Sequence, residues 1–517
     1  MPTLHWLTRE QDLKAAANAE YRLLAEEEQY SYGDPDAGNL IVQGDNLAAL
    51  KALLPFYAGQ VKCIYIDPPY NTGSAFEHYD DNMEHTLWLS MMYPRLELLK
   101  KFLAKEGAIF IQLDDSEQAY AKVICDEIFG RNNFVANIIW QKKYSPQNDA
   151  KWLSDNHDFI MLYARDKEMW RPNLLPRTEE MNARYRNPDN DVRGVWKPAD
   201  LSAKTYSAAT DYSIKTPSGR MVNPPKSRCW TVSKETFIKL VKDNRIWFGP
   251  KGDSVPAMKK FLTEVKQGAT ALTIWLYQEV GHNQDAKKEV KILLPDDAFS
   301  TPKPERLMQR ILTLSTNPGD YVLDSFLGSG TTAAVAHKMG RRYIGVEMGE
   351  QAKTHCAARL KKVIDGEQGG ISKAVGWEGG GGFRFFKLGD AVFDNERRIK
   401  PGISFENLAA HVYFTETKTP MKKHEKNSTF LGIHDGTAYA LLYNGILGDK
   451  RVNGGNVLTQ ATLNHIRRDM NAVAKNKGEK FACDKWVIYG EATRLTPASL
   501  AANNIVFKQT PYDIKVW

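Results

Sequence analysis

Apolar strands and helices alternate along two separate stretches of this 517-residue chain, and that alternation limits the fold more than any other feature. In the first stretch the pattern predicts strands at residues 39–45, 61–66 and 108–113 and a helix at 86–104. Such alternation is typical of a parallel sheet with crossover helices, in which ligands bind at the carboxyl ends of the strands. Asp45, Asp67 and Asp114 follow three of these strands, so we expect them at one edge of the sheet.

The second stretch predicts the other half of the sheet. Its expected elements are a helix at 301–316, a strand ending at Asp324, a helix at 331–339, a strand ending at Glu347 and a helix at 351–364. Between the first strand and its helix lies Asp324-Ser325-Phe326-Leu327-Gly328-Ser329-Gly330-Thr331. Its glycines let a cofactor lie against the backbone, and the helix N-terminus offers free N–H groups. No Lys follows the second glycine and the spacing is not Gly-x-Gly-x-x-Gly, which disfavours ATP and dinucleotides and favours a cationic sulfonium donor.

The strand at 61–66 runs directly into Asp67-Pro68-Pro69-Tyr70. This rigid rim can hold a planar heterocycle that carries an exocyclic amine. Asp67 and the Pro68 carbonyl would accept the two amine protons, and Tyr70 would stack on the ring. Proline holds φ near one value, so the direction of the carbonyl is set before substrate arrives. An ordinary Pro-Pro turn is the alternative interpretation, and the glycine turn in the same chain favours the catalytic one.

Together these motifs make the chain resemble an S-adenosyl-L-methionine-dependent DNA amino-methyltransferase of the permuted order, in which the catalytic motif precedes the cofactor motif. More narrowly, it resembles the Mod (modification) subunit of type III restriction-modification systems. The residues that carry this narrower resemblance are Gly44-Asp45-Asn46-Leu47, Asp67-Pro68-Pro69-Tyr70-Asn71-Thr72-Gly73, Asn156-His157-Asp158-Phe159-Ile160, Pro217-Ser218-Gly219-Arg220, Pro224-Pro225-Lys226-Ser227-Arg228-Cys229-Trp230, Thr301-Pro302-Lys303-Pro304-Glu305 and Gly380-Gly381-Gly382-Phe383-Arg384-Phe385-Phe386.

The resemblance implies methyl transfer from S-adenosyl-L-methionine to N6 of adenine in a defined duplex DNA sequence, with the target nucleotide flipped out of the helix. The implied catalytic residues are Asp67, Pro68, Pro69 and Tyr70. The implied cofactor-binding residues are Asp324, Phe326, Gly328, Gly330, Thr331, Glu347 and Asp45, with Thr301 and Lys303 at the carboxylate of the donor. The implied partners are double-stranded DNA, a second copy in a homodimer and a restriction (helicase-nuclease) subunit. No metal is expected, because methyl transfer from a sulfonium needs none.

Other functions stay open at this point. The same machinery could methylate N4 of cytosine, although Asp67 at the first motif position favours adenine by resemblance. The chain could be a stand-alone methyltransferase without a restriction partner. It could methylate protein or RNA, although Asn would be expected in place of Asp67 for glutamine substrates. Finally, it could be a DNA-recognition and assembly subunit with little catalysis.

Positive charge is concentrated between the two motifs. Residues 141–290 contain 26 Lys and Arg against 18 Asp and Glu, while the whole chain carries a net charge of +7. The same segment holds six of the twelve tryptophans: Trp152, Trp170, Trp196, Trp230, Trp247 and Trp275. Basic and aromatic side chains together suit a surface that meets phosphates and bases, although an ordinary solvated face is the simpler interpretation.

The expected fold is a Rossmann-like α/β methyltransferase core with an inserted target-recognition region and a smaller C-terminal α/β domain. We expect an N-terminal helix and the catalytic half of the core at 1–140, the insert at 141–295, the cofactor half at 296–365, a Gly-rich connection at 366–389 and an accessory or interaction domain at 390–517. The first part of the insert, to about residue 165, could belong to the core. The N-terminal helix is predicted at 10–29, and the C-terminal domain should contain strands at 411–414, 438–443 and 485–489.

The five cysteines are scattered without a Cys-x-x-Cys pair, which favours reduced thiols over disulfides or zinc. The chain shows no secretion signal and no apolar run of membrane-spanning length, so we expect a cytoplasmic protein without membrane contact.

Overall fold

The computed structural model describes residues 3–71, 84–148, 150–295, 299, 301–393, 399–400, 402–419, 421, 428–443, 455–477, 481 and 483–510. Thr72 and Gly73 of the predicted motif lie outside these residues. The chain divides into two compact units, Met1–Asn173 with Leu272–Trp517, and Leu174–Ala271. No helix in the described part of the chain is both long and apolar enough to cross a membrane.

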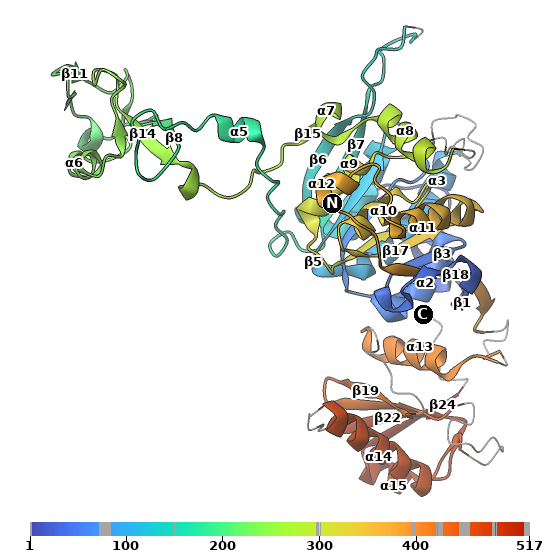
Figure 1. The fold of residues 1–517 in the computed structure, drawn as a ribbon. Helices are drawn as coiled ribbons and strands as arrows, with labels where there is room; N and C mark the ends of the chain where they lie inside the picture. Colours follow the sequence, from blue (N-terminus) through green and yellow to red (C-terminus); the bar gives the residue numbers. More distant parts are fainter. Residues whose placement is uncertain are drawn as a thin grey trace. The chain divides into compact units, whose positions relative to one another are not determined.

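The first unit is built on one large sheet (Figure 1). In spatial order its strands are β1 (Arg22–Glu26), β18 (Gly382–Ala391), β3 (Leu40–Gln43), β17 (Arg342–Glu347), β16 (Tyr321–Asp324), β4 (Val61–Ile66), β5 (Leu103–Leu113), β7 (His157–Ala164), β6 (Phe134–Gln141) and β15 (Ile274–Trp275), and β2 (Tyr32–Gly33) also pairs with β18. From β18 to β5 all neighbours are parallel, as predicted. The sheet as a whole is mixed, because β1 and β7 run antiparallel to their neighbours.

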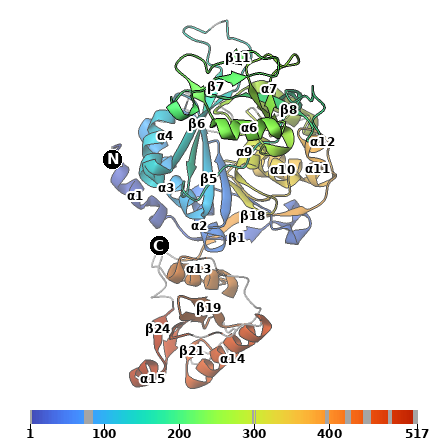
Figure 2. The ribbon, with the colours of Figure 1, turned by 90° about the vertical axis from the view of Figure 1, so that its left-hand side faces the viewer.

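Helices cover both faces of this sheet, which confirms the α/β class. They are α1 (Arg9–Asn18), α2 (Asn46–Tyr57), α3 (His85–Phe102), α4 (Gln118–Cys125), α7 (Tyr277–Val280), α8 (Asn283–Leu293), α9 (Glu305–Ser315), α10 (Thr331–Lys338), α11 (Ala358–Ile364) and α12 (Ser372–Val375). Figure 2 shows α2, α3 and α4 on one side of the sheet and α9, α10 and α11 on the other. The largest buried cluster joins the sheet to α2 and α3 and includes Leu50, Trp88 and Leu99.

Strand β4 carries the Asp67 motif and is hydrogen-bonded to β16, which ends at Asp324. Cys63 pairs with Val322 and Ile64 with Leu323, and all four side chains are fully buried. A strand covered by helices on both faces must be apolar on both faces, which explains the continuous apolar runs. Because the two strands are parallel, the residues that follow them emerge at the same edge of the sheet.

Two secondary-structure predictions are wrong. The predicted helix at 10–29 ends at Asn18, and β1 follows it because its backbone pairs with β18, a contact that local propensity cannot reveal. Residues 411–414, predicted as a strand, belong to helix α13 (Phe405–Thr417), whose start is capped by the Ser404 side chain accepting from the Asn407 N–H. A four-residue apolar run does not distinguish a buried helix from a strand.

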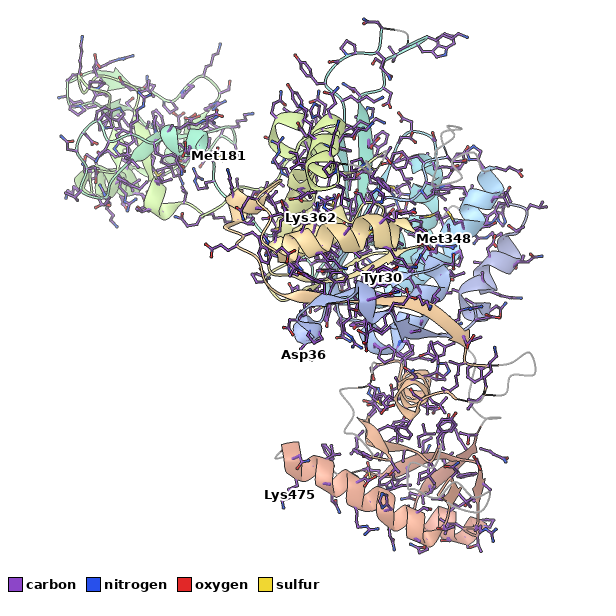
Figure 3. All side chains as sticks on the ribbon, turned by 45° about the vertical axis from the view of Figure 1, so that its right-hand side comes forward. Tyr30, Asp36, Met181, Met348, Lys362 and Lys475 are labelled. Carbon is purple, nitrogen blue, oxygen red and sulfur yellow. The ribbon has the colours of Figure 1, made fainter. Side chains whose placement is uncertain are left out.

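The C-terminal part contains a four-stranded sheet in the order β19 (Phe430–His434), β20 (Thr437–Leu441), β22 (Lys485–Gly490) and β24 (Ile505–Gln509), with β21 (Val457–Leu458) paired to β23 (Ala492–Thr493) and helices α14 (Gln460–Lys477) and α15 (Pro497–Ala502). The strands predicted at 438–443 and 485–489 are confirmed as β20 and β22. Helix α14 buries Leu463 and Ile466 against this sheet and exposes Lys475 (Figure 3).

The second unit is rich in short strands. Its sheets are β13 (Ile246–Trp247), β14 (Ala257–Phe261) and β8 (Trp196–Asp200); β10 (Ile214–Lys215) with β11 (Met221–Val222); and β12 (Cys229–Trp230) with β9 (Ser202–Ala203), accompanied by helices α5 (Glu179–Ala183) and α6 (Lys234–Lys242). Its core contains Leu201, Trp230, Phe237 and Phe248.

Four of the six tryptophans between the motifs are buried, which corrects the idea that they form a nucleic-acid surface. They are Trp170, Trp196, Trp230 and Trp275, each at most 3% exposed. Trp196 and Trp230 belong to the second unit, where large aromatic side chains supply much of the apolar area that a small unit can bury. Trp170 and Trp275 are buried in the first unit, so core packing accounts for all four.

A buried cluster of charges joins the helices on the second face of the sheet. Glu305 accepts hydrogen bonds from Lys338 Nζ at 2.8 Å and from Arg359 Nη2 at 2.8 Å. It also accepts from the Ile371 backbone N–H at 3.0 Å. Arg359 Nη1 donates in turn to Thr331 Oγ1 at 2.8 Å, so the cluster holds the first residue of α10.

We expect Glu305→Ala to destabilise the first unit by about 3–5 kcal/mol, because it leaves two buried cations with fewer acceptors. The midpoint of urea unfolding measures this loss. Glu350→Ala is the control, since Glu350 is 74% exposed and pairs with Lys353 at 3.5 Å, which predicts a loss below about 1 kcal/mol. Equal midpoint shifts in the two variants would contradict the role of the buried cluster.

Candidate active site

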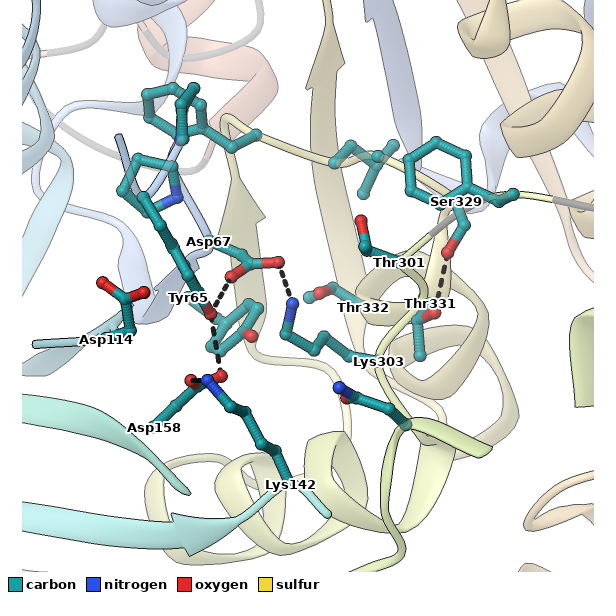
Figure 4. A pocket seen from close by; sticks show the side chains of 18 of the residues that line it. Tyr65, Asp67, Asp114, Lys142, Asp158, Thr301, Lys303, Ser329, Thr331 and Thr332 are labelled. Carbon is teal, nitrogen blue, oxygen red and sulfur yellow. Dashed lines mark hydrogen bonds and ion pairs between the residues drawn. The ribbon is translucent and has the colours of Figure 1, made fainter. Parts of the chain in front are cut away.

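A cavity of about 440 Å³ opens at the carboxyl ends of β4 and β16 (Figure 4). Its wall is formed by Tyr65, Asp67, Pro68, Pro69, Tyr70, Asp114, Lys142, Lys143, Asp155, Asp158, Asn283, Phe299, Thr301, Lys303, Asp324, Phe326, Leu327, Gly328, Ser329, Thr331 and Thr332. Both predicted motifs therefore face one space. Its volume lies within the range of ordinary small-molecule sites, roughly 300–1,000 Å³.

Asp67 is held by two donors on different elements. The Tyr70 hydroxyl donates to Oδ1 at 2.7 Å, and the Lys303 ammonium donates to Oδ2. Figure 4 shows the Lys303 side chain pointing at Asp67 across the cavity. Burial raises the pKa of Asp67, and the charge of Lys303 opposes that rise. Each carboxylate oxygen has two lone pairs, so Asp67 keeps capacity to accept a further proton donor.

The turn that carries the catalytic motif is fixed from outside the cavity. The Trp88 indole N–H donates to the Pro69 carbonyl at 2.8 Å. Asn71 adopts φ +61° and donates through its side chain to Glu117 at 2.7 Å. These contacts orient the tetrapeptide. Pro68, whose carbonyl is the second predicted acceptor, lies in the cavity wall.

The Tyr70 hydroxyl belongs to a buried polar network that sequence reasoning largely missed. Gln112 donates to the Tyr70 oxygen at 3.0 Å and to Asp158 Oδ2 at 2.9 Å. Lys142 donates to Asp158 Oδ1 at 2.7 Å and forms an ion pair with Asp155 at 2.7 Å. Asp158 lies within the Asn156-His157-Asp158-Phe159-Ile160 motif that carries the resemblance, but it was not predicted as a site residue, and no local pattern marked Gln112 or Lys142. They join the site only because β7 lies antiparallel between β5 and β6.

The glycine turn is shaped by two residues with positive φ, Gly328 at +54° and Gly330 at +78°. The Gly328 N–H donates to Glu347 Oε2 at 2.7 Å, which ties the turn to the end of β17. A Cβ at position 328 would be strained and would lie 3.3 Å from the Phe299 ring. The turn therefore keeps its backbone open to the cavity.

Asp324 stands at the start of this turn. It accepts from the Thr332 hydroxyl at 2.6 Å and from the Phe326 N–H at 3.0 Å. Burial raises the pKa of Asp324 to about 7, against these two hydrogen bonds, with the nearby carboxyls of Asp67 and Glu347 adding to the rise. The neighbouring Ser325 Oγ is buried and has no hydrogen-bond partner among the described residues.

Most of the predicted site residues line the cavity: Asp67, Pro68, Pro69, Tyr70, Thr301, Lys303, Asp324, Phe326, Gly328 and Thr331. Gly330 and Glu347 are absent from the wall, and Glu347 supports the turn from behind. Asp45 also lies outside the wall, where it caps α2 by accepting from the Ala48 N–H at 3.1 Å and pairs with Arg95 at 2.6 Å. Lys303, expected at the carboxylate of a donor, contacts Asp67 in this structure.

The composition of the wall suits a cationic donor beside a polar heterocycle. Five carboxyl groups line it against three ammonium groups, those of Lys142, Lys143 and Lys303. The glycine turn adds backbone that borders the cavity at Gly328 and Ser329. These features fit S-adenosyl-L-methionine better than a polyphosphate, which would need an excess of positive charge.

Comparison with known families decides the assignment. The family described as DNA methylase matches residues 61–358, more than half of the chain. The chain belongs to this DNA methylase family. The match begins at β4 and ends beyond β17, so it includes both strands that border the cavity.

Among curated relatives, the chain is similar to type III Mod subunits, which confirms the resemblance predicted from its motifs. It is 36% identical over 419 residues to the probable HindVI Mod subunit of Haemophilus influenzae, covering 71% of this chain and 56% of that protein. It is 35% identical over 327 residues to the StyLTI Mod subunit of Salmonella typhimurium, covering 57% and 49%. The chain thus spans about half the length of these two relatives. It is also 32% identical over 320 residues to the type II methyltransferase M.EcaI of Enterobacter cloacae, covering 60% and 66%.

The raised pKa of Asp324 makes a prediction about stability. Below about pH 4 the carboxyl is protonated in both the folded and the unfolded protein. Between about pH 4 and pH 7 the unfolded chain releases the proton while the folded protein keeps it, so stability falls as pH rises. Over this window we expect the free energy of unfolding of wild type to fall by on the order of a few kcal/mol relative to that of Asp324→Asn. Above about pH 8 we expect no further fall. Urea unfolding of both proteins at pH 4.5, 6 and 8 measures the difference, and a constant difference would contradict the assignment.

Proposed function

We propose that this protein transfers a methyl group from S-adenosyl-L-methionine to N6 of adenine in duplex DNA. The observation that carries the proposal is the shared cavity, where Asp67-Pro68-Pro69-Tyr70 faces the glycine turn of residues 324–331. Membership of the DNA methylase family supports the reaction class. Similarity to Mod subunits supports the type III modification role.

The chemistry asks little of the protein beyond placement. Bound S-adenosyl-L-methionine supplies an electrophilic methyl group on a positively charged sulfur. Asp67 and the Pro68 carbonyl accept the two protons of the adenine amine, which localises the nitrogen lone pair for attack. In such a reaction the amine nitrogen would bond to the methyl carbon, the electron pair of the S–C bond would stay on sulfur, and one amine proton would leave to solvent. Holding both reactants in line is the largest contribution that such a site makes.

Lys303 and Tyr70 prepare Asp67 for this role. Their two hydrogen bonds orient the carboxylate, and the positive charge of Lys303 favours its ionised, accepting form. The ammonium also lies 5.6 Å from the centroid of the Tyr70 ring. The Tyr70 hydroxyl is held by Gln112 and Asp67, which fixes the ring on which the base would stack.

The cofactor would be bound by the glycine turn. Asp324, Phe326, Gly328 and Thr331 supply its wall. Glu347 lies outside that wall and would act by holding the Gly328 N–H and so the shape of the turn. Thr301 lies on the same wall.

Two measurements test the reaction. The first maps methylated bases in the genome of a host with and without this gene, and the second identifies the modified nucleoside by mass spectrometry. We expect N6-methyladenine at one short sequence. Finding N4-methylcytosine would keep the mechanism and correct the base, and finding no DNA modification would overturn the proposal.

Asp67→Ala should reduce methylation at least about a hundredfold, because it removes an acceptor at the reacting amine. Binding of S-adenosyl-L-methionine, measured by calorimetry, should change little. Asp115→Ala is the matched control, since Asp115 is an exposed carboxylate near the end of β5 and outside the cavity wall. Near-normal turnover of Asp67→Ala would refute the assigned role.

We further propose that the second unit, Leu174–Ala271, selects the DNA sequence. It holds 18 Lys and Arg against 10 Asp and Glu, a net charge of +8, while the whole chain carries +7. Several of its acids are already paired internally, including Asp191 with Arg193 at 2.8 Å and Glu264 with Arg245 at 2.7 Å. Exposed Lys204, Lys215 and Lys226 would meet phosphates.

Replacing Lys204, Lys215, Lys226 and Lys251 together by Gln should weaken binding to all duplexes. It should also reduce the slope of the logarithm of the binding constant against the logarithm of the salt concentration, by roughly 0.9 for each phosphate that these lysines neutralise. Fluorescence anisotropy across a salt series measures both. The control replaces four exposed lysines outside this unit: Lys14, Lys105, Lys475 and Lys485. An unchanged slope in the first variant would remove the unit from the DNA interface.

We also propose partners for this protein. We propose a restriction subunit and a homodimer, and the first is supported by the Mod relatives.

A further inference from the structure

The connection between β6 and β7 exposes large apolar side chains. Trp152 is 83% exposed, Leu153 is 92% exposed and Tyr144 is 64% exposed. Figure 1 shows this connection as a teal hairpin that extends beyond the ends of both strands. Four other tryptophans between the two motifs are buried, so an exposed Trp next to an exposed Leu is not explained by folding.

Both ends of the hairpin form part of the active-site wall. Lys142 and Lys143 line the cavity at one end, and Asp155 and Asp158 line it at the other. Trp152 is three residues from Asp155, and three residues span at most about 10 Å. The exposed pair therefore lies close to the place where a flipped base would enter.

The base of the hairpin is fixed to the catalytic network. The Lys142 and Lys143 N–H groups donate to the Asn156 carbonyl at 2.9 and 3.3 Å. The Lys142 ammonium binds Asp155 and Asp158, and Asp158 Oδ2 lies 3.1 Å from the Tyr70 hydroxyl oxygen. A displacement of the hairpin would therefore shift the side chains that hold Tyr70.

Several described residues of the outer part of the hairpin also make contacts of their own. The Gln147 N–H donates to Ser154 Oγ at 2.8 Å. The Lys151 ammonium lies 5.2 Å from the centroid of the Trp152 ring, and the Tyr144 ring lies 5.0 Å from Tyr277. Trp152 is therefore exposed to solvent with one cation, Lys151, beside its ring.

We propose that Trp152 and Leu153 form a wedge that enters the DNA stack where the target nucleotide leaves it. This inference rests on the proposed function. Extruding a nucleotide leaves its neighbours unstacked, and an apolar or aromatic side chain in the gap replaces the lost stacking. Lys151 lies beside Trp152 and suits an adjacent phosphate. Duplex DNA is favoured over a protein partner because the hairpin arises from the wall of the site that must receive the base.

The test uses the full chain and a duplex carrying the mapped methylation site, with 2-aminopurine at the target position. Its fluorescence rises when the base leaves the stack. We expect Trp152→Ala/Leu153→Ala to lower that rise several-fold and to lower methylation of the adenine-containing duplex at least tenfold. Binding of S-adenosyl-L-methionine should be unchanged.

A second substrate separates a wedge from a general defect. When the target adenine lies opposite a mismatched base, extrusion needs less help. The double variant should then recover to within about threefold of wild type, and Trp152→Phe should retain most activity on the paired duplex. Leu7→Ala is the matched control, because Leu7 is also 92% exposed and should behave as wild type on both duplexes.

Three results would overturn the inference. The first is a 2-aminopurine fluorescence rise in the double variant equal to that of wild type. The second is an equal loss of methylation on the paired and the mismatched duplex. The third is a variant that differs from wild type only in the association of protein chains with one another. If wild type methylates neither duplex, the proposed function fails. If wild type and the double variant methylate both duplexes equally well, the proposed function stands and the wedge inference fails.

Discussion

The pairing of β4 with β16 is the contact on which the rest of this protein depends. Asp67 and Asp324 are 257 residues apart in the chain, yet the strands that precede them exchange backbone hydrogen bonds and bury their side chains completely. The entropic cost of closing such a long loop rises only slowly with its length, so a whole second unit can be inserted between the strands. The apolar strands bring together two motifs that are useless apart.

That pairing also places several carboxyl groups in one partly buried space. Asp67, Asp158 and Asp324 each have donors supplied by other elements: Lys303, Lys142 and Thr332. The positive charges offset the repulsion that burial would otherwise strengthen, and the hydrogen bonds set the direction of each oxygen before a substrate arrives. The site is therefore preorganised by neighbours that take no part in bond making.

The tryptophans show how composition can mislead. Their concentration between the motifs suggested a nucleic-acid surface, but four of the six are buried, Trp196 and Trp230 in the second unit and Trp170 and Trp275 in the first. The exposed one, Trp152, belongs to the unit that contains the cavity and sits on a hairpin rooted in its wall. Residue type alone does not distinguish a tryptophan that packs in the core from one that can contact a ligand. Its exposure and its position in the fold do.

The sequence by itself determined the α/β class, the two motifs and the family to which the chain belongs. These follow from local patterns: apolar runs that end in acids, prolines that hold φ, and glycines at positions 328 and 330 whose positive φ few other residues adopt. It also indicated that Asp67 and Asp324 must meet. The tertiary structure alone decided that residues 22–26 form an edge strand, that residues 411–414 are helical, and that Gln112, Lys142 and Lys303 hold the catalytic residues. Each of these depends on which strand or side chain lies opposite, and a contact between residues far apart in the chain leaves no periodic mark on either partner.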